Sequence, residues 1–298
     1  MASPHPRIFD RELVRARRRR AAALRPSTFL IDRVAEDMSD RLAAVLRRFD
    51  CAVDLGTPTA AVRRVVAASG KVGSVIAADT LVAADANLAI VTDEEALPFR
   101  DGSLDLVVSA LALHLVNDLP GTLVQIRRAL KPDGLLLAAL AGGDTLTELR
   151  QAFAAAETEI EGGISPRVAP FADVRDLGGL LQRAGFALPV TDVDRLTVRY
   201  RSPLELMQDL RRMGATNPLV ERSRRPLRRA TLDRMVEIYD DRFSEHDGRV
   251  RATFEIVWLT GWAPHESQQK PLPPGSARQR LADALGTKEI PAGEKTGR

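Results

Sequence analysis

The sequence predicts an α/β protein built on a doubly wound, mostly parallel β-sheet. Between residues 51 and 140, short apolar runs alternate with stretches of helical periodicity. The runs are almost continuously hydrophobic, as expected for strands of a parallel sheet that is covered on both faces. Several of them end in a polar residue, at the edge where such a sheet binds its ligands. Together these features indicate β-α-β units around one central sheet.

The first elements follow from the chain in order. Two helices are expected within residues 10–48, where apolar residues recur at helical spacing. The strands of the parallel part are expected at 51–56, 74–79, 88–93, 104–110 and 134–140, with crossover helices at 59–68 and 120–130.

The second half of the chain is predicted to complete the sheet and cover it. Helices are expected at 144–159 and 173–185, a long strand or strand pair at 186–200, helices at 202–214 and 227–243, and a last strand at 251–262. We therefore expect four parts, which are an N-terminal helical arm (1–48), a core (49–200 with 251–263), a helical lid (201–250) and a flexible tail (264–298).

The composition limits the class of protein. The 298 residues are 45% hydrophobic, which suffices for one large domain with an insert or for two small domains. No apolar run approaches the roughly 20 residues of a membrane-spanning helix, and no signal-peptide pattern follows the basic N-terminus. A cytoplasmic location is therefore expected. The single cysteine, Cys51, excludes an internal disulfide and a cysteine-based zinc cluster.

Two clusters of arginines stand out against a net charge of only +3. They are Arg15, Arg17, Arg18, Arg19 and Arg20, and Arg222, Arg224, Arg225, Arg228 and Arg229. Such clusters fit contact with nucleic acid, acidic protein or lipid head groups, or simply solvated helix faces. Aromatic residues are sparse and are not interleaved with the bases, so no nucleic-acid partner is expected.

Polar residues at the strand ends predict a cofactor site. The order of strands is that of a class I methyltransferase sheet, in which S-adenosylmethionine lies across the carboxyl ends of the strands. The candidate cofactor-binding residues are Asp54, Gly56, Asp79, Asp93, Glu94 and Ser109. Asp79 is placed to accept hydrogen bonds from ribose hydroxyls, and Asp93 with Glu94 to meet the amine of adenine. Taken singly, each aspartate also fits a helix cap or a turn.

Longer motifs carry a resemblance to known families. The stretch "DEEALPFRDGSLDLVVSALALHLVNDLPGTLVQIRRALKPDGLLLAAL" resembles the methyltransferases that include the malonyl-carrier-protein methyltransferase of biotin synthesis. The stretches "AGGDTLTELRQAFAAAETEIEGGISPRVAPF", "DLGGLLQRAGF", "ELMQDLRRMGATN" and "HESQQKPLPPGSA" resemble the mitochondrial complex I assembly factors of methyltransferase fold, which also have alpha-proteobacterial members. The resemblance implies a factor associated with the inner membrane that hydroxylates an arginine of a quinone-arm subunit of complex I.

The expected cofactor loop departs from the family pattern. Where the family has a glycine-rich loop, this chain has Gly56-Thr57-Pro58-Thr59-Ala60. Glycines let backbone N–H groups approach the methionine carboxylate of the cofactor, whereas Pro58 lacks an N–H and Thr57 adds a branched side chain. Losing two or three hydrogen bonds of about 0.5–1.5 kcal/mol each weakens binding by about ten- to a thousandfold. S-adenosylmethionine binding is therefore expected to be weak or lost, while the next helix can still begin at Pro58.

Two residues are candidates for chemistry. His114 follows the fourth strand and fits a general base, a substrate-orienting group or a packing histidine. Asp144 fits the rim of the pocket, or the N-cap of the helix that follows. An arginine hydroxylase would need an oxygen-activating cofactor, but the spacing of His114, His265 and Asp144 does not require an iron site, so no metal is assigned.

The predicted lid combines an apolar stripe with basic neighbours. Leu204, Met207, Leu210 and Arg211 lie at helical spacing, and the second arginine cluster follows. Such a lid suits a protein substrate or an anionic membrane surface, although a stripe packed on the sheet under solvated arginines is an alternative.

Three functions are compatible with these residues. The first is a complex I assembly factor that acts on a protein substrate, with possible peripheral membrane association. The second is an S-adenosylmethionine-dependent methyltransferase acting on a small molecule or carrier protein, and the third is a non-catalytic binding protein. The oligomeric state, the reaction and the use of a metal stay open.

Overall fold

The computed structural model describes residues 7–82, 85–269, 283 and 286–287. Residues up to Pro264 form one compact unit, and His265–Arg298 form a second unit. Most of the tail that we expect at 264–298 lies outside the described residues.

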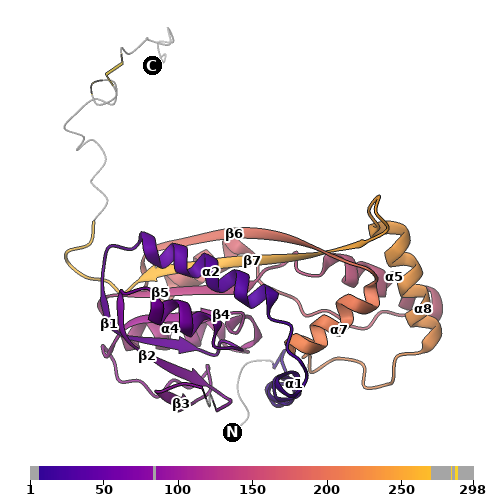
Figure 1. The fold of residues 1–298 in the computed structure, drawn as a ribbon, viewed down its shortest axis with the longest axis horizontal. Helices are drawn as coiled ribbons and strands as arrows, with labels where there is room; N and C mark the ends of the chain where they lie inside the picture. The colour runs from indigo at the N-terminus through magenta and orange to yellow at the C-terminus, as the bar shows by residue number, and fades with distance from the viewer. Residues whose placement is uncertain (1–6, 83–84, 270–282, 284–285, 288–298) are drawn as a thin grey trace, which may run out of the picture. The chain divides into compact units, whose positions relative to one another are not determined.

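Within the described chain, seven strands form one sheet in the order β3-β2-β1-β4-β5-β7-β6 (Figure 1). The strands are β1 (Phe49–Leu55), β2 (Val72–Asp79), β3 (Ala89–Val91), β4 (Leu104–Ala110), β5 (Leu130–Ala141), β6 (Ala187–Tyr200) and β7 (Val250–Trp262). The neighbours from β3 to β5 pair in parallel, and β7 pairs antiparallel with both β5 and β6. This arrangement confirms the predicted class I methyltransferase sheet.

Helices cover both faces of the sheet. They are α1 (Arg11–Ala23), α2 (Phe29–Ala44), α3 (Ala61–Ala68), α4 (Leu119–Ala129), α5 (Thr147–Glu161), α6 (Val174–Arg183), α7 (Pro203–Met213) and α8 (Arg229–Phe243). Buried side chains of α2, α3, α5, α7 and α8 form one core, and those of α4 and α6 form the other. Helices α7 and α8 lie between β6 and β7 in the chain, as predicted for the insert.

The central strands supply both cores because successive side chains of a strand point to opposite faces. In β5, Leu135 and Leu137 belong to the first core, and Leu136 and Leu140 belong to the second. All four side chains are at most 2% exposed. This burial on both faces explains why the sequence of β5 reads as a continuous apolar run.

Two predicted helix starts are wrong. Helix α3 begins at Ala61 and not at Pro58, and the N–H of Ala61 donates to Thr59 Oγ1 at 3.2 Å. Helix α5 begins at Thr147 after Leu146, whose φ of 58° is left-handed, so Asp144 is not its N-cap.

The late start of α5 has a backbone cause. Residues before it continue to pair with β7, where the N–H groups of Gly142 and Leu146 donate to the carbonyls of Glu255 and Thr253 at 2.8 and 2.7 Å. The Thr145 hydroxyl adds a hydrogen bond to the Glu255 carbonyl at 3.0 Å. A segment held in this way cannot take up helical hydrogen bonds.

Candidate functional site

A cavity of about 230 Å³ lies at the carboxyl ends of the central strands. Gly56 and Pro58 after β1, Ala112 after β4, and Thr145 after β5 contribute to its wall. Helix α1 supplies Val14 and closes one side. The cavity therefore occupies the place where a doubly wound sheet binds its ligand.

The Thr57 side chain fills part of the predicted cofactor loop. Its hydroxyl donates to the Asp54 carboxylate and accepts a hydrogen bond from the N–H of Ala110 at 3.1 Å. Thr57 is 5% exposed, and so it faces the protein interior rather than the cavity. The threonine thus links the ends of β1 and β4.

Asp54 lies beneath this loop as a buried carboxyl group. It is 3% exposed, and the nearest arginine, Arg63, approaches it only to 3.7 Å. Burial raises the pKa of Asp54 to about 7, although the Thr57 hydroxyl and Arg63 oppose the increase. Asp54 therefore supports the loop from below and offers little surface to a cofactor.

Gly56 is the one glycine that the loop keeps, and the structure requires it. Its φ is +71°, and an added Cβ would lie 2.7 Å from Glu94 Oε1 and 2.9 Å from the Ala112 Cβ. A side chain at this position would be strained and would push Glu94 away.

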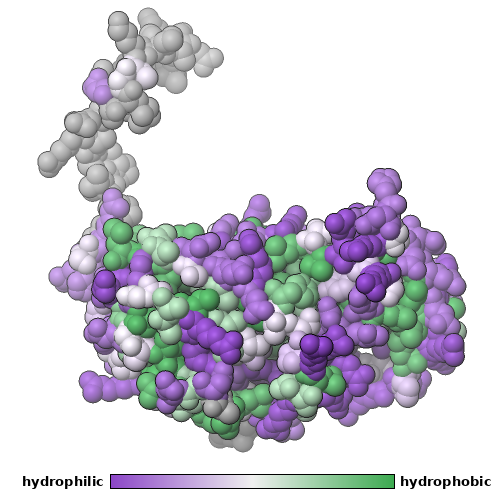
Figure 2. All heavy atoms as spheres, in the orientation of Figure 1, coloured by the Kyte–Doolittle hydropathy of each residue, from purple (hydrophilic) through white to green (hydrophobic). Residues whose placement is uncertain are grey.

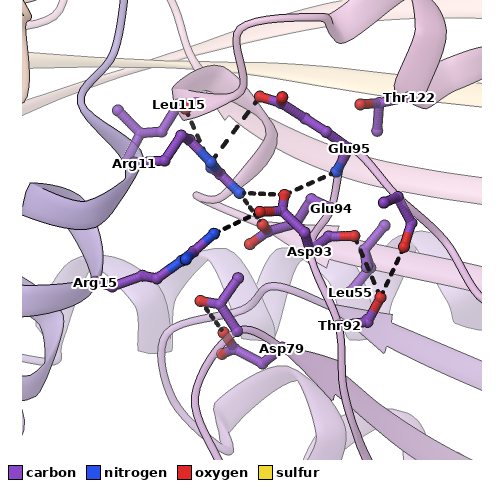
Figure 3. Close-up of polar contacts among 12 residues, drawn as sticks. Arg11, Arg15, Leu55, Asp79, Thr92, Asp93, Glu94, Glu95, Leu115 and Thr122 are labelled. Carbon is purple, nitrogen blue, oxygen red and sulfur yellow. Dashed lines mark hydrogen bonds and ion pairs between the residues drawn. The ribbon is translucent and has the colours of Figure 1, made fainter. Parts of the chain in front are cut away.

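Arginines of α1 form ion pairs with carboxylates that we predict to bind the cofactor (Figure 3). Arg11 bonds to Asp93 at 2.9 Å and forms a second ion pair with Glu94. Arg15 reaches the other oxygen of Asp93 at 2.6 Å. Glu94 is 2% exposed, so its charge is balanced inside the protein and not by solvent.

The third pair lies at the end of β2. Arg18 donates to both oxygens of Asp79, at 3.0 and 2.6 Å, in the fork geometry of a bidentate pair. The side chains of Arg18 and Asp79 are 11% and 13% exposed. The pKa of the neighbouring Asp93 lies below its usual range. Burial alone would raise this pKa, but the hydrogen bond from the Glu95 N–H and the charge of Arg11 lower it further than burial raises it.

These contacts do not fit S-adenosylmethionine in the arrangement observed. The ribose hydroxyls would need Asp79, and the adenine amine would need Asp93 or Glu94, yet each of these carboxylates already binds a guanidinium group. The loop adds a proline without an N–H where the methionine carboxylate would be held. The residue types of a cofactor site are present, but α1 covers them.

His114 lines the cavity beyond the end of β4. The N–H of Ala141 points to its Nδ1 at 3.4 Å, and the edge of the Phe171 ring packs against it at 5.4 Å between centroids. Burial lowers the pKa of His114 to about 4, so the imidazole is neutral near pH 7. Because Nδ1 accepts, the proton resides on Nε2, and His114 offers a hydrogen-bond donor.

A second cavity of about 300 Å³ adjoins the first on the α7 side. His114 and Phe171 are among the residues that line both cavities. The second cavity adds Phe153 and Met207 and the charged side chains of Arg17 and Arg167. A ligand bound there would lie next to the His114 ring.

Several predicted site residues lie elsewhere. Ser109 is fully buried, and its hydroxyl donates to the Leu55 carbonyl at 2.7 Å, which joins β4 to β1. Asp144 pairs with Arg195 on β6 and lies outside the lining of both cavities. Ser109 is therefore closed to a cofactor, whereas the exposed Asp144 is not among the residues that line the two cavities.

The described residues contain no group of three histidine, cysteine, aspartate or glutamate side chains that could hold a metal ion. His265, one member of the iron set considered from the sequence, bonds locally to Ser267 at 2.6 Å. In the same part of the chain, none of the helices is long and apolar enough to cross a membrane.

The predicted lid stripe is partly wrong. Pro203, Leu206 and Leu210 are the buried residues of α7, whereas Leu204 is 42% exposed. The buried face therefore includes Leu210 of the proposed stripe but is otherwise displaced by one residue from Leu204 and Met207.

Sequence reasoning also missed the inward-facing arginines of α1. Arg11 was not among the candidates, and Arg15 and Arg18 were assigned to a basic cluster. Their spacing of four and three residues places all three on one face of a helix, and this spacing indicates that they can contact a common surface.

Comparison with known proteins places the chain in a family. Residues 53–138 match the methyltransferase-domain family. The chain is 41% identical over 281 residues to "Arginine-hydroxylase NDUFAF5, mitochondrial" of Homo sapiens, which covers 91% of this chain and 81% of the relative. The relative of the same name from Danio rerio is 38% identical over 287 residues, 93% of this chain and 89% of the relative.

Further matches cover a smaller part of the chain. A malonyl-[acyl-carrier protein] O-methyltransferase of Gallionella capsiferriformans is 40% identical over 179 residues, 59% of this chain and 58% of the relative. The crystal structure of the YcgJ protein of Bacillus subtilis aligns with a TM-score of 0.52 at 16% identity, over 78% of this chain and 98% of that one, and this likeness concerns the fold alone. By its similarity over most of its length, the chain belongs to the methyltransferase-fold family of the arginine hydroxylase NDUFAF5.

Proposed function

We propose that this protein modifies an arginine side chain of a protein partner, and that the partner is a subunit of respiratory complex I. The relatives that match it over most of its length are named arginine hydroxylases. Hydroxylation replaces a C–H bond by C–OH, consumes dioxygen and a two-electron reductant, and releases the second oxygen as water. Both co-reactants are supplied from outside the chain in this proposal.

The observation that carries the proposal is the pairing of carboxylates in the cleft with guanidinium groups of α1. Asp93 and Glu94 bind the guanidinium of Arg11, and Asp79 binds that of Arg18, all next to the cavity. Planar, bidentate pairing of this kind is how proteins recognise arginine. A cleft that binds arginines of its own helix has the chemistry to bind an arginine of another chain.

His114 is the residue that we assign to substrate positioning. It lines both cavities, and its neutral ring presents an Nε2 donor. A donor that is aimed at a carbonyl of the substrate backbone would orient the arginine side chain toward the acidic end of the cleft. Because the pKa of His114 is lowered to about 4, this donor keeps one protonation state across neutral pH.

The test is mass spectrometry of complex I from source cells with and without the gene. The proposal expects one arginine of a quinone-arm subunit to carry an added oxygen atom that is missing from the deletion strain. A His114→Gln strain should lose the oxygen in the same way, since glutamine at this position would no longer hold the donor in place. Unchanged arginines in the deletion strain would refute the proposal.

A conventional methyltransferase is the second candidate. It is favoured by the retained Asp79 and Asp93 at the strand ends and by the similarity to a carrier-protein methyltransferase over the core. Calorimetric titration with S-adenosylmethionine, followed by a search for a methyl group missing from the deletion strain, separates the two reactions. If the deletion removes neither modification but still blocks assembly of complex I, the protein acts as a binding factor only.

A further inference from the structure

Helix α1 closes the cleft mainly through charge. Within α1, only Val14 and Ala21 are buried, whereas Arg11, Arg15 and Arg18 reach Glu94, Asp93 and Asp79. Apolar burial holds most surface helices of globular proteins in place. Here the ion pairs carry that role, and ion pairs can be exchanged for other hydrogen-bonding partners.

The two ends of α1 are attached differently. At its start, Asn117 Oδ1 accepts hydrogen bonds from the N–H groups of Ile8 and Phe9 at 2.9 and 2.8 Å, and the Asp10 N–H donates to the Pro218 carbonyl at 2.8 Å. After its last buried residue, residues 22–26 are exposed. The helix is thus fixed at its N-terminus, and further along Arg15 and Arg18 hold it over the carboxylates while Arg17 donates to the backbone carbonyls of Thr216 and Asn217.

We propose that α1 is a competitive cover, so that a nucleoside cofactor binds only after Arg15 and Arg18 release Asp93 and Asp79. The inference does not depend on which reaction the cleft performs. It states that the carboxylates at the strand ends bind either the arginines of α1 or a ligand, and that the arginines must dissociate before the ligand binds.

The geometry supports competition rather than simultaneous binding. Arg18 uses both oxygens of Asp79, and its guanidinium lies where ribose hydroxyls would donate. A nucleoside cofactor therefore needs the acceptors that α1 now takes.

Competition and closure predict opposite responses of α1. If α1 competes, the cofactor favours the open state, and the measured affinity is reduced by the fraction of molecules that are open. If α1 instead closes over the bound cofactor, its amide protons become better protected. Amide hydrogen exchange on the full chain distinguishes the two, because α1 supplies its own peptides over residues 11–23.

The experiment compares the wild type with two double variants. Arg15→Ala/Arg18→Ala removes pairs to Asp93 and Asp79, and Arg19→Ala/Arg20→Ala removes exposed arginines of the same helix as a matched control. S-adenosylmethionine is titrated into each by calorimetry, and exchange over residues 11–23 is measured with and without it. Thermal melts show that both variants are folded.

The proposal expects the first variant to bind at least roughly tenfold more tightly than the wild type and the control. It also expects S-adenosylmethionine to speed exchange in α1 of the wild type. Equal or weaker binding by the first variant, or slower exchange in α1 on addition of the cofactor, overturns it. Absence of binding in all three proteins overturns it as well, and leaves the arginine modification to be judged by its own mass-spectrometric test.

Discussion

The Asp54→Asn substitution tests the account of the strand ends through the pH dependence of stability. Burial raises the pKa of Asp54 to about 7, whereas an aspartate of an unfolded chain titrates near ~3.9. The folded protein therefore holds a proton between these values that the unfolded chain has lost. The contribution of Asp54 to stability is fully present below about pH 4 and is lost as the pH rises through about 7. At about 1.4 kcal/mol for each pKa unit, the loss amounts to about 4 kcal/mol.

The asparagine variant has no such proton to lose. Its free energy of unfolding, measured by urea titration, should gain about 4 kcal/mol relative to the wild type between about pH 4 and pH 8. Asp101→Asn, at an exposed aspartate on the surface, is the control and should follow the wild type. A constant difference between Asp54→Asn and the wild type across this range would show that Asp54 is solvated or firmly paired, and would refute the buried-carboxyl account.

Two further predictions concern the cavity wall and the surface. His114 has a pKa lowered to about 4, so the wild type should lose about 3 kcal/mol as the pH falls from about 6.5 to 4. His114→Gln should lack this acid-side loss in urea titrations, and equal loss in both proteins would contradict the assignment. Reversal of four exposed arginines before and at the start of α8 to glutamate should block assembly of complex I in cells, while the melting temperature stays within about 2 °C. Normal assembly would remove these four positions from the partner surface. The four positions are Arg224, Arg225, Arg228 and Arg229.

The sheet could be predicted from the sequence because its signals are local. The strand predicted at 104–110 has these same bounds in the structure, where all seven residues are buried. A short apolar run that follows a polar turn is typical of a buried strand. The β3 strand was predicted over 88–93 but spans only Ala89–Val91, and all three residues are exposed. An edge strand has one neighbour and little burial, so its length depends on pairing that the sequence does not display.

The candidate site could be predicted only in part because its contacts span long distances in the chain. Asp79 and Asp93 were placed correctly at the strand ends, but their partners Arg18 and Arg15 lie 61 and 78 residues away. The missing glycines pointed to a weakened loop, yet only the structure shows that Thr57 turns inward to bond Asp54 and the Ala110 N–H. Side-chain direction in an irregular loop does not follow from periodicity.

Figure 2 shows hydrophilic side chains gathered over the α8 end of the molecule, with hydrophobic patches between them elsewhere on this face. Arg224, Arg225 and Arg228 are exposed in the loop before α8, while Leu227 of the same loop packs against the core. An exposed basic loop of this kind can meet an acidic protein or an anionic membrane surface at little cost in stability. We therefore propose that the cleft binds one arginine side chain of the partner and that this loop contacts the surface of the partner or of the membrane.

The arginines of α1 also balance the negative charge of the cleft. Glu94 is almost completely buried, and a buried carboxylate without a partner would cost several kcal/mol. Arg11 balances that charge, so any ligand that displaces α1 must bring its own donors or a positive charge to Glu94 and Asp93. A substrate guanidinium meets this requirement, and a neutral adenine amine meets it only in part. Under the function that we propose, a substrate guanidinium would replace the charge that Arg11 supplies to Glu94 and Asp93.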